Sequence, residues 1–443
     1  MRCPPWPSRC HIFLRDGGYR DGNTGPQRLP IPPALSIDSG ALSEAGEMRD
    51  LHSILLHPST GIAGLLSLFL ILGTIKFGFS ISWFISSLSG ILAFTAGSAL
   101  SRRLESPLIL LASSELMVFL VIFFSFYRMA GQLSLLISSA WLAVANASPL
   151  LVRLKRVRPP VYSILTFSVG SLMTAHSFFT IPSVIELRSS SSIPLEGAFG
   201  MFLIFISYPS ILEWLLDLGK RAVSSSFFLL SVILMLLHGF RADAILILLS
   251  TFLILSRRSR KLAYLTLLSI FFLYIGIDVM RTELKVSALE RPLFRMSTTY
   301  YYSKELASYF LRPFPVEPFW LTSIPLHPSQ TIGRGIFGKD FGITPTIFIG
   351  MLMDLGFIGM LLLSALLGLI SGYSYGKFMR GEETFSYPIV WPLLITRTEI
   401  GLTQLDISII FGSALFSLLL NFFNGSSRAT PGVKPCLTTT TVP

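Results

Sequence analysis

The chain has 443 residues, of which 51% are apolar and only 13% are charged, with a formal net charge of +11. Apolar runs of about 16 to 25 residues recur from Ile54 to Phe423, which is the pattern of successive membrane-spanning helices and argues against a soluble domain. The three cysteines, Cys3, Cys10 and Cys436, lie outside this region, so the membrane part contains no disulfide framework, thiolate metal site or cysteine nucleophile.

Two terminal segments depart from the apolar pattern. Residues 1–47 contain seven of the 27 prolines and no apolar run, so we expect either a disordered leader or a misassigned start, with Met48 as the true first residue. Residues 424–443 are polar and lack periodicity, and we expect a disordered cytoplasmic tail there.

Between these segments the sequence predicts an all-α fold, a polytopic bundle of transmembrane helices. Residues 48–280 are assigned to transmembrane helices 1–9, residues 281–342 to an external loop, and residues 343–423 to helices 10–12. Gly368 and Gly372 predict a close contact with another helix, because small residues four apart let two backbones approach. The expected spans, about twelve, are 58–78, 80–100, 107–126, 132–152, 161–182, 198–216, 222–238, 242–256, 262–280, 343–373, 387–403 and 405–423.

Basic residues alternate between the short connections. Fourteen of them lie in five alternate connections, the first at Arg102 and Arg103 and the last at Lys377 and Arg380. The positive-inside rule therefore predicts a multi-pass protein of the cell membrane with both termini in the cytoplasm. The intervening short connections contain only four basic residues, which are expected outside: Arg128, Arg188, Arg241 and Arg397.

The connection 281–342 is unusually long. Because successive connections alternate between the two sides of the membrane, it is expected outside. Structureless loops longer than about 15 residues are usually functional. Its eight basic residues and the run Tyr300–Tyr302 would suit an anionic lipid headgroup and sugar rings. It also contains five acidic residues, so a solvated, salt-bridged cap is an equal alternative.

The sequence HGFRAD, residues 238–243, forms the tip of an external hairpin between two short apolar runs. His238, Arg241 and Asp243 are therefore expected at or just below the outer membrane interface, where a charge is costly unless it is paired or hydrated. A functional role competes with simple helix capping and anchoring at the headgroup layer.

Motifs of many soluble enzymes are missing from the sequence. It contains no GxGxxG, Walker A, HExxH, GxSxG or CxxC motif. ATP-driven transport and zinc proteolysis are therefore not expected, and neither a cofactor nor a metal ion is predicted.

Two segments resemble a known family: HGFRADAILILLSTFLILSRRSRK and TIGRGIFGKDFGITPTIFIGMLMDLGFIGMLLL. With the long external loop between them, they look like the oligosaccharide repeat-unit polymerases, the O-antigen-polymerase-like membrane proteins. In that family an arginine follows a glycine at an outer helix tip, and a GR...TPT...G...D/N-x-G-x-x-G segment leads into the helix after the main loop. The resemblance covers residues 48–423 in architecture and these two segments in motif.

The resemblance implies transfer of a growing glycan from a polyprenyl pyrophosphate carrier to a sugar of an incoming lipid-linked repeat unit. Such a transfer needs cations to stabilise the leaving pyrophosphate and a base for the acceptor hydroxyl. The implied partners are polyprenyl-pyrophosphate-linked oligosaccharide and membrane lipids, with other glycan-assembly membrane proteins as an open option. No nucleic acid is expected.

This implied chemistry assigns roles to individual residues. Arg241, Arg334 and His238 are candidates for substrate binding, with lipid-headgroup anchoring as the alternative for Arg334. Asp243 is a candidate catalytic group that orients the substrate or acts on the acceptor.

Two more residues are candidate catalytic groups. His327 precedes PSQTIGRGIFG, which loosely resembles the histidine-glycine loop of O-antigen ligases, although an ordinary loop histidine is the alternative. Asp354 is a carboxylate inside an apolar span, where ionisable groups are functional candidates by default and a hydrogen-bonded helix contact is the alternative.

Two other functions compete with polymerisation. A transporter or flippase of a lipid-linked saccharide should have polar groups near the membrane midplane in two related halves, and no such repeat is evident. A glycosyltransferase that uses a polyprenyl monophosphate donor usually has an acidic pair in its first external connection. The first external connection here, around GFSI, contains no carboxylate.

Overall fold

The computed structural model describes residues 56–101, 110–117, 119–120, 139, 143, 159–180, 195–236, 241–280, 290–315, 328–339, 343–382 and 386–425. All of them belong to one compact unit, Leu51–Pro443. These residues form helices and connections and no strand, which confirms the all-α prediction for this part of the chain. The predicted leader 1–47, the tail beyond Gly425 and most of the predicted spans 107–126 and 132–152 lie outside the described residues.

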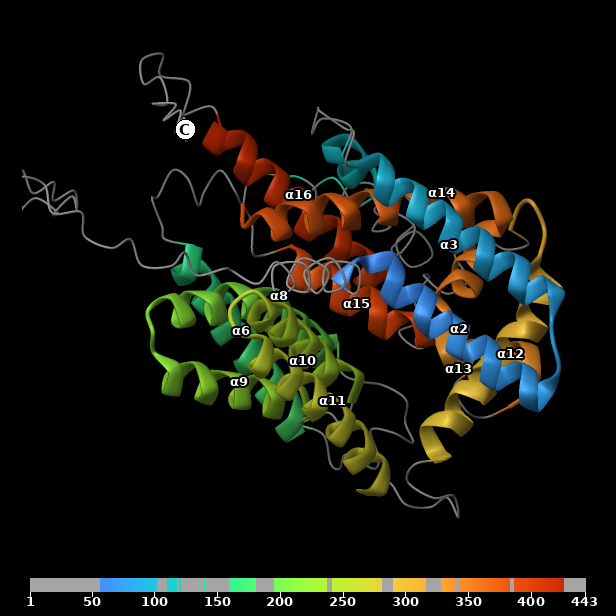
Figure 1. The fold of residues 1–443 in the computed structure, drawn as a ribbon, viewed down its shortest axis with the longest axis horizontal. Helices are drawn as coiled ribbons and strands as arrows, with labels where there is room; N and C mark the ends of the chain where they lie inside the picture. Colours follow the sequence, from blue (N-terminus) through green and yellow to red (C-terminus); the bar gives the residue numbers. More distant parts are fainter. Residues whose placement is uncertain are drawn as a thin grey trace, which may run out of the picture. The chain divides into compact units, whose positions relative to one another are not determined.

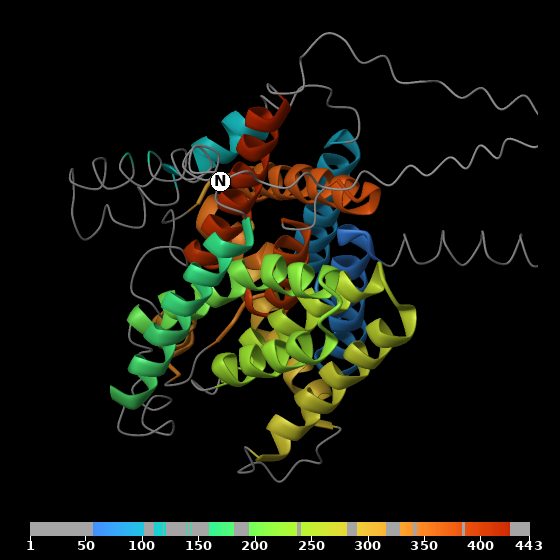
Figure 2. The same cartoon turned by 90° about the vertical axis from the view of Figure 1, so that its left-hand side faces the viewer.

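The described helices form two groups that α15 (Tyr387–Ile400) joins, as Figure 1 shows by label and Figure 2 by colour. α15 contacts members of both groups and is followed by α16 (Gln404–Gly425). The first group contains α6 (Pro159–Thr180), α8 (Leu195–Asp217), α9 (Arg221–Leu236), α10 (Arg241–Ser256) and α11 (Arg260–Met280). The second contains α2 (Pro58–Phe77), α3 (Ile81–Ser101), α12 (Glu290–Phe310) and α14 (Ile347–Arg380).

Four of the described helices are long and apolar enough to cross a membrane: α2, α3, residues Phe199–Asp217 of α8, and α14. Several of their outward side chains are strongly apolar, since Ile75 of α2 is 80% exposed and Leu92 of α3 is 61% exposed. Such faces suit lipid rather than water. Shorter apolar helices coincide with parts of α9, α10, α11 and α16. The predicted number of about twelve spans remains a prediction.

A close helix contact joins α3 and α14 through small residues. A Cβ atom at Gly368 would lie 1.9 Å from the Phe94 carbonyl oxygen, and one at Gly372 would lie 2.6 Å from the Ser98 carbonyl oxygen. Only glycine lets the two backbones approach this closely. The predicted role of Gly368 and Gly372 in a helix contact is confirmed.

The predicted span 343–373 is wrong as a continuous helix. α14 extends to Arg380, and Gly356 interrupts it with φ 69° and ψ −178°, a backbone conformation that is nearly restricted to glycine. A Cβ atom at Gly356 would lie 2.5 Å from the carbonyl carbon of Phe314. The chain that follows α12 therefore occupies the space beside the break.

The break in α14 leaves backbone amides that need partners. The amides of Phe357 and Ile358 donate to the carbonyl oxygens of Arg312 and Pro313, at 2.8 and 3.2 Å. Backbone groups in a membrane must be satisfied by protein, and these bonds meet that requirement.

The predicted external loop 281–342 contains helices in its described parts. α12 crosses the end of α2, where Lys304 Nζ donates to the Phe77 carbonyl oxygen at 2.9 Å. α13 (Pro328–Phe337) packs on α12 through Phe337 and Tyr302, whose ring centroids lie 4.9 Å apart. This part of the chain is therefore not the structureless loop that we expected.

Tyr300 is fully buried against the turn between α2 and α3. Its hydroxyl donates to the Gly78 carbonyl oxygen at 3.2 Å and accepts from the Ser80 amide at 3.1 Å. The hypothesis that Tyr300 packs on sugar rings is therefore wrong, because its ring holds α12 against the α2–α3 turn. Tyr301, by contrast, is exposed.

Contacts between helix ends reveal the relative directions of several helices. Where α2 begins, His57 Nε2 lies 3.3 Å from Ser98 Oγ near the end of α3. The Tyr387 hydroxyl at the start of α15 donates to the Leu56 carbonyl oxygen at this same end. α2 and α15 therefore start together where α3 ends, as the alternation of basic connections predicts. Which end faces the cytoplasm remains a prediction.

Candidate functional site

The sequence HGFRAD leads into α10, which begins at Arg241. Asp243 lies in the first turn of α10 and is half-buried. The side chain of Arg241 and the whole of His238 and His327 lie outside the described residues.

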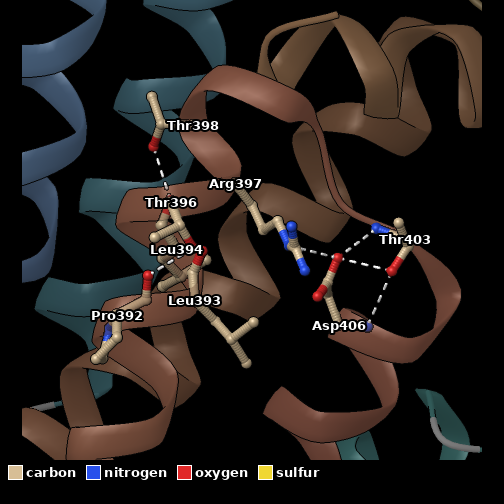
Figure 3. Close-up of polar contacts among 8 residues, drawn as sticks. All are labelled: Pro392, Leu393, Leu394, Thr396, Arg397, Thr398, Thr403 and Asp406. Carbon is tan, nitrogen blue, oxygen red and sulfur yellow. Dashed lines mark hydrogen bonds and ion pairs between the residues drawn. The ribbon is translucent and has the colours of Figure 1, made fainter. Parts of the chain in front are cut away.

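Arg397, near the end of α15, faces Asp406 in the first turn of α16 (Figure 3). Arg397 Nε lies 2.9 Å from Asp406 Oδ2. The Asp406 side chain is 2% exposed and that of Arg397 is 15% exposed. Because water screens this ion pair weakly, its attraction exceeds that of a surface pair.

A short turn brings these two residues together. α15 ends at Ile400, and the Gly401 amide donates to the Arg397 carbonyl oxygen at 2.9 Å. Gly401 has φ 74°, in the left-handed region that glycine adopts readily at a helix C-terminus. The chain therefore reverses within three residues, Gly401 to Thr403, and α16 starts at Gln404.

Thr403 and Asp406 form a capping box at the start of α16 (Figure 3). The amide and hydroxyl of Thr403 donate to Asp406 Oδ2 at 2.8 and 2.7 Å, and the Asp406 amide donates to the Thr403 hydroxyl at 3.3 Å. The carboxylate that faces Arg397 is thus held in place by its own helix.

Asp243 completes a group of three charged side chains from three helices. Its carboxylate interacts electrostatically with both Arg397 and Asp406. Arg397 contacts Asp406 through Nε, and its two terminal nitrogens lie farther out on the guanidinium. Those nitrogens form a fork whose geometry matches two oxygens of a phosphate.

Two neighbouring contacts connect this group to other elements. Arg295 of α12 forms an ion pair with Glu399, two residues beyond Arg397 on α15. A Cβ atom at Gly401 would lie 3.3 Å from the carbonyl oxygen of Pro345. The TPT segment, residues 344–346, therefore adjoins the turn that follows Arg397.

The other two described candidates lie on different elements from Asp243. Arg334 lies on α13 and is exposed, whereas Asp354 is buried in α14, two residues before the break at Gly356. Among the residues that the structure describes, no three His, Cys, Asp or Glu side chains come together as ligands of a metal ion would.

Sequence reasoning placed Arg397 among the four external arginines but did not propose it, or Asp406, as a site residue. The signal for Asp406 is the sequence TQLD, residues 403–406, in which a threonine followed three residues later by an acid predicts a capping box. The signal for Arg397 is a charge close to the end of an apolar helix.

Comparison with protein families gives one match. A family model described as "Putative O-antigen polymerase" matches residues 56–411, which is well over half of the chain. The chain belongs to the O-antigen polymerase family.

Membership of the O-antigen polymerase family agrees with the resemblance seen in HGFRAD and the TPT segment. It identifies an integral membrane protein whose general activity is polymerisation of lipid-linked repeat units, and it does not favour the transporter alternative. No curated protein and no solved structure matches the chain.

Proposed function

We propose that this protein transfers a growing glycan from its polyprenyl pyrophosphate carrier to a sugar hydroxyl of an incoming lipid-linked repeat unit. The reaction takes place at the end of the bundle where α10 and α16 begin, which we propose faces the outside of the cell, with both termini in the cytoplasm. The observation that carries this proposal is the group of Asp243, Arg397 and Asp406, which brings one cation and two carboxylates together at the ends of three helices.

Each residue has a defined task in this reaction. The bond between the sugar anomeric carbon and the pyrophosphate oxygen breaks, and its electron pair leaves with the pyrophosphate. Arg397 and Arg241 bind that leaving group and stabilise its developing charge. The acceptor oxygen forms the new glycosidic bond, and Asp243 accepts its proton.

The remaining sequence candidates fit around this centre. His238 and Arg334 are proposed to bind the substrate, while His327 and Asp354 are proposed as further catalytic groups. The substrate partner is polyprenyl-pyrophosphate-linked oligosaccharide within the membrane, and other glycan-assembly membrane proteins are proposed as neighbours.

Elongation by the purified protein tests this function. With lipid-linked repeat units as substrate, wild type should produce longer carrier-linked glycans on a gel, whereas Arg397→Ala and Arg241→Ala should lose about 100-fold or more in kcat. Arg258→Ala is the matched control. Arg258 lies in the connection after α10, at the other end of that helix, where it pairs with Asp217 of α8. If wild type moves intact lipid-linked units across vesicle membranes without lengthening them, the protein is a transporter instead.

A further inference from the structure

The first turn of α14 is a buried helix end without a cap. Thr346 is the N-cap residue, and its side chain makes no capping hydrogen bond. Among the described residues, no acceptor faces the amides of Ile347, Phe348 and Ile349, all of which are buried. Buried donors without an acceptor are costly, so a helix end of this kind is a site at which a bound group can satisfy them.

The side chain at this helix end also lacks a partner. Thr346 Oγ1 is fully buried and has no hydrogen-bond partner. Gly90 of α3 packs on Phe348, since a Cβ atom there would lie 2.4 Å from the Phe348 ring.

The chemistry of these groups defines the ligand. Backbone amides can only donate hydrogen bonds, and the Thr346 hydroxyl can donate as well. A helix N-terminus also carries a partial positive charge. Together these properties select a group that only accepts, and phosphate is one of the anions that helix N-termini bind.

We propose that the first turn of α14, with Thr346 at its N-cap, binds one phosphoryl group of the lipid-linked pyrophosphate substrate. This proposal rests on the proposed function. The subsite adjoins Arg397, because Pro345, the residue before Thr346, contacts the Gly401 turn that follows Arg397. The Arg397 fork then holds the other phosphoryl group, and the α14 amides hold this one.

α12 covers the subsite. The Thr346 amide donates to Ser303 Oγ of α12 at 3.0 Å, and Ser303 is itself fully buried. A phosphoryl group reaches the first turn of α14 only when this part of α12 moves away. The Ser303 hydroxyl and the Thr346 amide then become available to the ligand.

The substitution Thr346→Val tests the subsite because it replaces the hydroxyl with a methyl group of similar size. The hydroxyl has no partner, so the variant should unfold at the same temperature as wild type or higher. Its affinity for inorganic pyrophosphate should fall about tenfold, measured from the pyrophosphate-induced rise in Tm in detergent. Thr346→Ser keeps the hydroxyl and should bind as wild type does.

Thr174→Val is the matched control. Thr174 is also fully buried, and its hydroxyl has no partner among the described residues, but it lies on α6 in the other helix group. Its pyrophosphate affinity should not change. Equal affinity in Thr346→Val and wild type overturns the proposal, as does a wild type whose Tm does not respond to pyrophosphate.

Two further measurements separate failure of the subsite from failure of the proposed function: the glycan elongation assay, and the pyrophosphate response in bilayers of defined lipid. A wild type that binds pyrophosphate through Thr346 without elongating glycans supports the subsite and contradicts the proposed function. If wild type and Thr346→Val both elongate glycans with the same KM, the subsite is contradicted and the proposed function is not. In bilayers of anionic phospholipid the pyrophosphate response should persist, and its loss there would assign the site to ordinary lipid headgroups.

Discussion

Asp406 takes part in two local structures at once. One of its oxygens accepts both donors of Thr403 in the capping box and also faces Arg397 Nε. The capping box fixes the carboxylate, and the carboxylate in turn orients the guanidinium. In the proposed function, this fixed guanidinium binds a phosphate without rearranging first, which lowers the entropic cost of binding.

Asp406→Asn should weaken both the fold and the site. The amide can still accept from Thr403, but the buried ion pair with Arg397 is lost, at a cost of about 1 to 3 kcal/mol. The KM for lipid-linked substrate should rise and kcat should fall, together lowering kcat/KM about tenfold, because Arg397 is present but less well oriented toward the leaving group. Thermal unfolding and steady-state elongation rates measure the two effects.

Glu399→Gln is the control for Asp406→Asn. It breaks the neighbouring Arg295–Glu399 ion pair, in which the Arg295 side chain is 39% exposed, so it should cost only about 0 to 1 kcal/mol and leave KM unchanged. Equal rises in KM for the two variants would mean that Asp406 has no special role in positioning Arg397.

At the scale of single residues, sequence patterns predicted where a charged residue lies more reliably than which residue it contacts. The location of Asp243 and Arg397 near helix ends follows from the charge pattern of short connections, and the helix start at Arg241 agrees with it. The pairing of Arg397 with Asp406 depends on the φ 74° turn at Gly401, which a sequence suggests only weakly. Asp243 joins them through packing of α10 on α15, which the sequence does not encode locally.

Among the elements, α14 departs most clearly from expectation. The sequence DLGFIG, residues 354–359, lies inside a long apolar stretch, and hydropathy alone cannot distinguish a straight helix from a broken one. The break exists because the backbone after α12 packs against Gly356 and supplies carbonyl acceptors to the next amides. That information lies in residues 312–315, about 40 positions earlier in the chain.

Gly356→Ala should destabilise the protein by about 3 kcal/mol or more. The new Cβ would meet the Phe314 backbone at 2.5 Å, and the conformation at φ 69° and ψ −178° is strained for alanine. The measurement is the shift in thermal unfolding temperature in detergent. Gly64→Ala is the control, because a Cβ at Gly64 of α2 meets nothing within 4 Å, and it should be neutral or slightly stabilising. Similar shifts for both variants would argue against a tertiary cause for the break.

For the whole molecule, apolar runs of about 16 to 25 residues were sufficient to predict an all-α membrane protein, because runs of this length span a bilayer as helices, whereas a spanning strand needs only about 10 residues. The helix contact at Gly368 and Gly372 was also predictable, since small residues at a spacing of four have few other uses. The buried position of Tyr300 was not, because a hydrophilic connection was expected to be solvated and instead folded as α12 across the end of α2.

The arrangement of helices brings Asp243, Arg397 and Asp406 together at one end of their helices. The starts of α10 and α16 meet the end of α15 there, and the TPT segment before α14 adjoins them. Charged and hydrogen-bonding groups at the end of a bundle suit a substrate whose lipid stays in the membrane while its pyrophosphate and sugars lie at the interface. This arrangement is the one that the proposed polymerisation on a lipid carrier would use.

The stoichiometry of carrier release tests the central claim most directly. Purified protein in proteoliposomes would receive lipid-linked repeat units, and both the added repeat units and the released polyprenyl pyrophosphate would be counted. We predict one released carrier for each repeat unit added, with both counts abolished together in Arg397→Ala. Lipid-linked units that cross the membrane with no carrier released and no increase in glycan length would contradict the proposed function.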